Sequence, residues 1–315
     1  MSSSAAPSTR IEAPGMSRLI TVSDEPGPNR GKVLCEELES GNILYFPQTP
    51  FSLEDEDLKF LLASKQTGAA YHKNIAYRPG ADRITGLDKT DGPEVDRLRS
   101  ILRGYSRRAG QFLAALLTPY AGKWKFDFAS YRPLEERGRP ARLRARNDLP
   151  HVDAFPTRPT NGDRILRLFT NINPLQNRVW MTTQTFEVIG PRFARTLGLP
   201  RARSANPLVS AIRELAKVMY FPGANRSPYD DFMHRCHNAM KEDAQFQESC
   251  PKRRWEFPPH STWMVFTDCV SHAGLEGQYA VEQTFIVSQK AMVQPEKSPL
   301  SILEALAGHT LTISN

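Results

Sequence analysis

Hydrophobic and polar positions alternate in short stretches along much of the chain, which is typical of strands that bury one face. The alternation is clearest from Arg164 to Asn171 and from Val179 to Phe186. Other short apolar stretches predict strands at 42–47, 126–132, 262–266 and 279–287. So many short strands favour a mainly β fold.

Helical spacing of apolar residues interrupts this pattern in four places. The longest helix is expected at 93–117, where apolar side chains recur every three or four residues. Ser52 and Asp55 resemble a capping box that opens a shorter helix. A helical insertion with two helices is predicted at about 204–250, and Gly308 is expected to end a last short helix.

Residues 1–30 differ from the rest of the chain, because they are rich in Ser, Ala, Pro and Gly and have little to bury. A flexible N-terminal tail is therefore expected there. Residues 31–315 are expected to form a single domain. Its core is predicted to be a jelly roll, the cupin-like double-stranded β-helix, with the helical insertion and flanking helices around it.

The composition is that of a soluble globular protein, with 40% hydrophobic and 24% charged residues in 315. A formal net charge of +7 favours anionic partners. The four cysteines form no CxxC pair, so a reducing cytoplasm is expected. The chain shows no signal-peptide core and no apolar run of about 18 residues, so we expect any membrane association to be peripheral.

A candidate metal site begins at His151 and Asp153, which are two positions apart and would project from the same face of a strand. One imidazole from a distant strand would complete a 2-His-1-carboxylate triad, which holds Fe(II) and leaves positions open for a co-substrate and O₂. His272 follows the buried strand at 262–266 and is the expected third ligand. The alternative is that both histidines are ordinary polar residues near strand ends.

An iron oxygenase that uses 2-oxoglutarate must also bind the distal carboxylate of that co-substrate, and a bidentate arginine is its natural partner. Many such enzymes place this arginine shortly after the distal histidine, where this chain has Thr284 and no Arg or Lys. Arg167 is the first candidate, because it is expected to share a strand face with Asn171, and we expect Asn171 and Thr284 to contribute to co-substrate binding as well. Arg132 is the second. An outward-facing position on a sheet edge is the alternative for Arg167.

The remaining histidines are weaker candidates. On the predicted helix, His234 and His237 share a face while Cys236 turns away, so we do not expect a zinc site there. His72, His260 and His309 are solitary and are expected to be surface or packing residues.

Several motifs of this chain are similar to those of a known family, the Kdo 3-hydroxylases. They lie at 131–135 (YRPLE), 149–160 (LPHVDAFPTRPT), 164–174 (RILRLFTNINP), 227–230 (SPYD), 257–268 (FPP and STWMVFTD), 272–273 and 282–285 (EQTF). The resemblance runs from about residue 40 to residue 310. It implies an Fe(II)/2-oxoglutarate/O₂-dependent dioxygenase with a double-stranded β-helix, whose iron ligands are His151, Asp153 and His272.

The resemblance also implies the substrate, which is the sugar acid Kdo of the lipopolysaccharide inner core, already attached to lipid A. Hydroxylation at C3 would convert it to Ko at the cytoplasmic face of the inner membrane of a Gram-negative bacterium. Six arginines lie in the segment 132–146, here called the arginine loop. Of these, Arg139, Arg142 and Arg144 are predicted to hold the anionic headgroup at the membrane surface.

Two other functions stay open at this point. The chain could be an Fe(II)/2-oxoglutarate hydroxylase of another anionic substrate, or a non-catalytic jelly-roll protein that binds lipopolysaccharide or nucleic acid. Against nucleic acid, the arginine loop has no interleaved aromatic residues to stack on bases. The sequence leaves open whether the protein is an oligomer.

Overall fold

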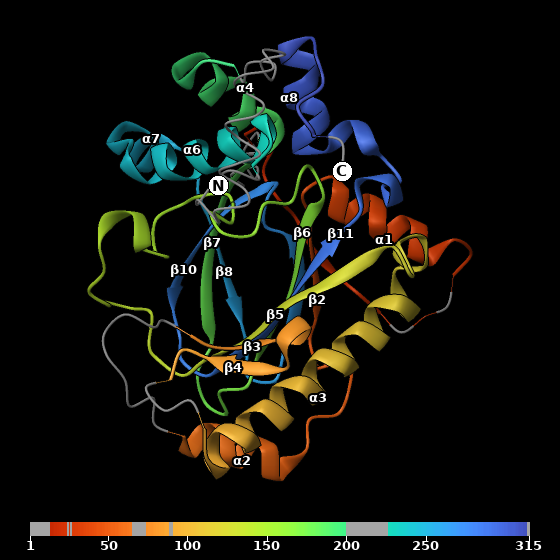
Figure 1. Cartoon of the computed structure of the whole chain (residues 1–315), viewed down its shortest axis with the longest axis vertical. Helices are drawn as coiled ribbons and strands as arrows, with labels where there is room; N and C mark the ends of the chain where they lie inside the picture. Colours follow the sequence, from red (N-terminus) through yellow and green to blue (C-terminus); the bar gives the residue numbers. More distant parts are fainter. Residues whose placement is uncertain are drawn as a thin grey trace, which may run out of the picture.

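Two sheets face each other and enclose a wedge-shaped interior (Figure 1). The computed structural model describes residues 13–23, 25, 27–64, 74–87, 91–199 and 226–313. In the larger sheet the strand order is β1 (Leu19–Thr21), β2 (Ile43–Phe46), β9 (Thr262–Phe266), β6 (Arg164–Asn171), β11 (Ala280–Val287), β5 (Trp124–Arg132), β3 (Ile75–Arg78) and β4 (Arg83–Thr85). The smaller sheet has the order β10 (Val270–Glu276), β7 (Arg178–Thr185) and β8 (Arg253–Phe257).

Apolar side chains from both sheets pack together, which confirms the predicted jelly-roll core. Phe169 of β6 stacks on Trp263 of β9, and Trp180 of β7 meets both of them edge-on. All three aromatic residues are buried. This packing joins the sheets at one side of the interior and leaves the polar residues farther along the strands to line it.

Helices cover the outside of the sheets. Helix α3 (Pro93–Leu116) crosses the larger sheet over β5, β11 and β3, and α1 (Arg30–Glu39) packs on β2 and β9. The remaining described helices are α2 (Asp55–Ala63), α4 (Phe186–Leu197), α6 (Pro228–Glu242), α7 (Ala244–Ser249) and α8 (Pro299–Ala307). Helices α4, α6, α7 and α8 gather at one end of the molecule, at the top of Figure 1.

The predicted strands outside the His151 segment agree closely with the structure, but one strand end and one helix start were wrong, and β1, β3, β4, β8 and β10 were not predicted. Strand β6 has the predicted bounds, but β7 ends one residue early because Phe186 begins α4. Helix α2 is capped by Glu54 rather than by Ser52. Three consecutive acidic residues fill its first turn, where the positive end of the helix dipole favours them.

The predicted tail of residues 1–30 contains a strand. Residues Leu19 to Thr21 of β1 pair in parallel with β2, and the amide of Arg18 donates to the side chain of Asn42. Ser17 is fully buried. This part of the predicted tail therefore packs against the sheet, because its Leu-Ile-Thr stretch offers enough apolar surface to extend it.

The predicted helical insertion is confirmed where the structure describes it. Helix α6 begins with a capping box between Ser227 and Asp230, and α7 follows directly. The first predicted helix of the insertion lies outside the described residues. Near the C-terminus, Gly308 ends α8 in a left-handed conformation (φ 73°), as predicted.

Candidate active site

The segment that carries His151 and Asp153 is not the short strand that the sequence predicted. Of residues 150–156, only His151 pairs, by an isolated bridge to His272 with reciprocal backbone N···O distances of 3.1 and 2.9 Å. The prolines at either end, Pro150 and Pro156, have no amide hydrogen to give to a ladder. The bridge still brings the two predicted histidines together, with ring centroids 4.9 Å apart.

Each imidazole is oriented by a backbone carbonyl. The Nδ1 atom of His151 lies 2.7 Å from the carbonyl oxygen of Leu149, and Nδ1 of His272 lies 2.9 Å from that of Val270. A carbonyl oxygen only accepts, so Nδ1 carries the proton and Nε2 keeps its lone pair. Metal-binding histidines are commonly held in this way.

A third imidazole, which the sequence analysis set aside, reaches the same place. His237 of α6 has its ring centroid 4.8 Å from that of His151, and its Nδ1 lies 2.8 Å from the carbonyl oxygen of Val152. Among the described residues, possible ligand atoms of His151, Asp153 and His237 all lie within 4.8 Å of one another. The sequence placed His237 on a helix but held no signal that this helix packs on the H-x-D segment.

Burial keeps the three imidazoles neutral, and nearby positive charge keeps the Asp153 carboxylate ionised, as cation binding requires. Burial lowers the pKa of His151 to about 3 and that of His237 to about 4, and it also lowers the pKa of His272. For Asp153, burial acts to raise the pKa, but Arg167 and His151 outweigh it and hold the pKa well below its usual value. Neutral imidazoles beside an ionised carboxylate are the donor set that suits Fe(II).

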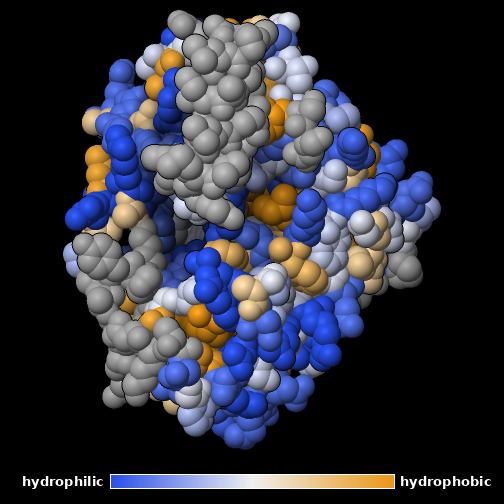
Figure 2. Space-filling view, in the orientation of Figure 1, coloured by the Kyte–Doolittle hydropathy of each residue, from blue (hydrophilic) through white to orange (hydrophobic). Residues whose placement is uncertain are grey.

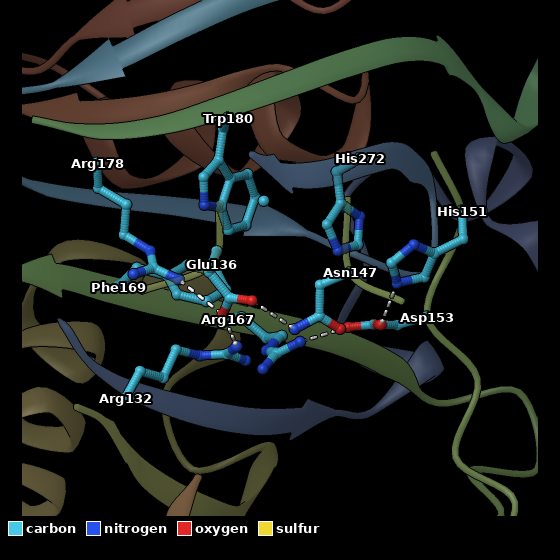
Figure 3. A pocket seen from close by; sticks show the side chains of 11 residues that line it. Arg132, Glu136, Asn147, His151, Asp153, Arg167, Phe169, Arg178, Trp180 and His272 are labelled. Atoms are coloured by element: carbon cyan, nitrogen blue, oxygen red, sulfur yellow. Dashed lines mark hydrogen bonds and ion pairs between the residues drawn. The ribbon is translucent and has the colours of Figure 1, made fainter. Parts of the chain in front are cut away.

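A chain of buried ion pairs leads away from Asp153 (Figure 3). Arg167 binds Asp153 through Nη1 at 2.7 Å and Glu282 through Nη2 at 2.5 Å. Glu282 also accepts from Nε of Arg132 at 2.8 Å. Glu136 then joins Arg132 (3.4 Å) to Arg178 (3.2 Å). Three arginines and three carboxylates thus alternate in the space between the two sheets.

All of these residues except Glu282 line one cavity together with His151 and His272. Figure 3 shows His151, Asp153 and His272 at one side of it and Arg132 and Arg178 at the other. In the described part of the chain, three buried donors here have no hydrogen-bond partner: Nε of Arg167, Nε of Arg178 and Nε1 of Trp180. Buried donors without a partner are rare, so they indicate a missing polar ligand. A dicarboxylate suits this set.

Two of these cavity residues were missed from the sequence. Arg178 and Trp180 are two positions apart on β7, so they share a face, and Trp180 stacks on His272 with ring centroids 5.2 Å apart. The predicted strand began at Val179, so Arg178 lay one residue outside it and the alternation did not single it out. Arg167 and Arg132, the two predicted anchors, both line the cavity.

The other predicted residues lie elsewhere. The side-chain amide of Asn171 donates to two carbonyl oxygens, of Gln176 and Phe257, and does not line this cavity. Thr284 lies opposite Arg167 in the pairing of β11 with β6 and lines a second cavity.

The arginine loop connects to the cavity at both ends, because Glu136 and Asn147 line the cavity wall. Arg142 and Arg144 are exposed, whereas Arg139 is half-buried. Arg144 forms an ion pair with Glu242 of α6 at 2.5 Å. The loop is therefore fixed to the helical end of the molecule and presents Arg142 to solvent.

Comparisons with known proteins agree with this geometry. A family model described as 3-deoxy-D-manno-oct-2-ulosonic acid (Kdo) hydroxylase matches residues 21–310. A solved structure of the Kdo hydroxylase KdoO with cobalt(II), described as a non-heme Fe(II) alphaketoglutarate-dependent dioxygenase, is 34% identical. The match covers 94% of this chain and 98% of that one, with a TM-score of 0.82. A structure of KdoO with alphaketoglutarate and Fe(III) is 33% identical, over 93% and 97% of the two chains, with a TM-score of 0.80. A search of curated proteins found no match.

Proposed function

The chain belongs to the Kdo hydroxylase family, and from this premise we propose that it hydroxylates C3 of Kdo on the lipopolysaccharide inner core. The enzyme is an Fe(II)- and 2-oxoglutarate-dependent dioxygenase that uses O₂. One observation supports this function above the others: a His–carboxylate–His set with neutral imidazoles shares a cavity with three arginines. The His–carboxylate–His set suits Fe(II), and the three arginines suit a dicarboxylate beside it.

We propose His151, Asp153 and His272 as the iron ligands. These three line the cavity that the arginines share, whereas His237 approaches Asp153 from α6 and does not line it. His272 is also held in place by the bridge to His151 and by stacking on Trp180. Iron content distinguishes the two imidazoles: His272→Ala should lose stoichiometric Fe(II), and His237→Ala should retain it.

The bound metal and co-substrate supply the oxidising chemistry, and the residues of the chain control geometry and charge. Arg167 orients the Asp153 carboxylate and keeps it ionised. Backbone carbonyls accept from Nδ1–H of the two histidines, so Nε2 is the atom of each that would bind the metal. We propose that Arg178 and the second predicted anchor, Arg132, hold the distal carboxylate of 2-oxoglutarate, since Nε of Arg178 and Nε1 of Trp180 have no hydrogen-bond partner among the described residues. Arg167, the first predicted anchor, already bridges Asp153 and Glu282.

The finer features of the substrate also belong to this proposal. We propose that it is Kdo linked to lipid A and that the protein acts at the cytoplasmic face of the inner membrane. The described part of the chain has no helix that meets the length and apolarity needed to cross a bilayer. On the face seen in Figure 2, hydrophobic residues form small groups among hydrophilic ones. We propose an electrostatic contact through Arg139, Arg142 and Arg144, of which Arg142 and Arg144 are exposed.

The test is turnover with purified Kdo-lipid A, Fe(II), 2-oxoglutarate and O₂. We expect succinate to form and the Kdo residue to gain the mass of one oxygen atom. Succinate without any change in the sugar would favour a hydroxylase of another anionic substrate. No succinate under any of these conditions would favour the non-catalytic binding protein.

A further inference from the structure

A second cavity lies on the inner face of the larger sheet, beside the proposed iron site. Its volume is about 430 Å³, which is within the range of about 300–1,000 Å³ that is usual for small-molecule sites. Arg167 lines both cavities, and its partner Glu282 lines the second. The ion pair between them therefore separates the second cavity from the proposed iron site.

Two more arginines enter this cavity around an aromatic ring. The guanidinium carbon of Arg158 lies 3.8 Å from the ring centroid of Phe128, and that of Arg78 lies 4.7 Å from it. Arg158 also lies 4.2 Å from the ring of Phe155. Its Nη2 pairs with Asp127 at 3.2 Å. These contacts hold Arg158 in one orientation before any ligand arrives, and such preorganisation lowers the cost of binding.

The cavity has capacity for further hydrogen bonds. In the described part of the chain, Nε of Arg158 and Oδ1 of Asn74 are buried and have no hydrogen-bond partner. Hydroxyl groups of Ser130 and Thr284 also line the wall. The side chain of Arg158 is 32% exposed, so a ligand can reach it. Cationic groups, hydroxyls and two aromatic rings together form a surface that suits an anionic sugar.

The position of the cavity matches the chemistry of the proposed substrate. In Kdo the carboxylate is C1 and the carbon proposed to react is C3, so only C2 separates them. Whatever binds the carboxylate must therefore lie next to the iron ligands. Phe155 and Arg158 follow Asp153 closely in the sequence, and both line this cavity.

We propose that this second cavity binds the Kdo sugar, with Arg158 and Arg78 holding its carboxylate and Phe128 and Phe155 packing against its ring. The proposal rests on the proposed function. Arg132 and Arg178 are less suited to this role, because they line only the first cavity, and Arg167 already pairs with both Asp153 and Glu282. Lipid A phosphates are another possible anion for Arg158 and Arg78, and a phosphate-free probe separates the two.

The experiment measures binding of the α-methyl glycoside of Kdo, and of its C1 carboxamide, to the iron- and 2-oxoglutarate-loaded enzyme without O₂. We expect Arg158→Gln to weaken binding of the carboxylate form about 10–100-fold, the effect of losing a charge-assisted hydrogen bond. Binding of the carboxamide should change less than about threefold. Arg78→Gln should act in the same direction, and Arg158→Lys should restore part of the difference between the two probes.

Arg83→Gln is the matched control, because Arg83 is an exposed arginine on β4 that does not line the cavity. It should leave binding of both probes unchanged. Equal weakening of both probes by Arg158→Gln, no weakening of either, or a wild-type enzyme that does not bind the glycoside would each overturn the proposal. A wild-type enzyme that forms no hydroxylated Kdo-lipid A would instead overturn the proposed function, which a separate turnover assay reports.

Discussion

Strand β6 carries two arginines, three positions apart, that face opposite sides of the larger sheet. Arg164 binds Asp268 through Nε at 2.7 Å, and its guanidinium lies 4.2 Å from the ring centroid of Phe266. Arg167, on the inner face, binds Asp153 and Glu282. Both arginines are paired with aspartate, and in both the carboxylate partners raise the pKa against the effect of burial.

The difference between them lies in their unused hydrogen-bonding capacity. Arg164 is fully buried, and all three of its guanidinium nitrogens have protein partners. Nε of Arg167 has no partner in the described part of the chain, and this side chain lines two cavities. Burial and a shifted pKa therefore do not identify a functional arginine here. The distinguishing feature is a hydrogen-bond donor on a cavity wall that has no partner. Predictions about the two faces of the strand test this distinction.

The largest expected effect is on the inner face, at the proposed metal. His151→Ala should abolish succinate formation and hydroxylation, because an iron ligand is lost, while the melting temperature stays within a few degrees of the wild type. Activity and thermal unfolding measured on the same preparation check this. Substantial turnover at saturating iron would remove His151 from the proposed ligands.

On the outer face we expect the opposite pattern. Arg164→Met should lower the free energy of unfolding by about 3–5 kcal/mol, because Asp268 is left buried without its partner. The folded fraction should keep its KM for 2-oxoglutarate. Urea unfolding measures the change in the free energy of unfolding, and steady-state kinetics measure the KM for 2-oxoglutarate. The double variant with Asp268→Leu should regain much of the loss, and a double variant as unstable as the single one would contradict this account.

How much of this contrast could be predicted from the sequence depends on how far apart along the chain the residues that determine each feature lie. Alternation within β6 is local, and its bounds were predicted correctly. The pairing of His151 with His272 was predicted because the chemistry demands a third ligand. The approach of His237 and the burial of Arg178 depend on how α6 and the two sheets pack, which no short pattern encodes. Their roles therefore needed the structure.

Arg178 offers an intermediate case, because it is buried and its Nε has no hydrogen-bond partner among the residues that the structure describes. Arg178→Gln should raise the KM for 2-oxoglutarate about 10–100-fold, since a charge-assisted contact to the carboxylate is lost. Initial rates over a range of 2-oxoglutarate concentrations measure this, and the exposed Arg83→Gln is the control. An unchanged KM would mean that Glu136, and not the co-substrate, is the main partner of Arg178.

The smallest effect is expected for the arginines that are neither buried nor on a cavity wall. Changing Arg139, Arg142 and Arg144 together to Glu should lower kcat/KM on Kdo-lipid A in anionic vesicles by roughly tenfold at low salt, because the local field that attracts the membrane is reversed. Salt should reduce the difference in kcat/KM between the variant and the wild type, since exposed charges are screened within about 8 Å at physiological ionic strength.

The triple variant also loses the ion pair between Arg144 and Glu242, so Arg144→Gln is needed as a control for that contact. Turnover of the soluble Kdo methyl glycoside should not change. If it falls as much as turnover of the lipid substrate, the substitutions act on the cavity through Glu136 and Asn147, and the arginine loop is not the membrane contact.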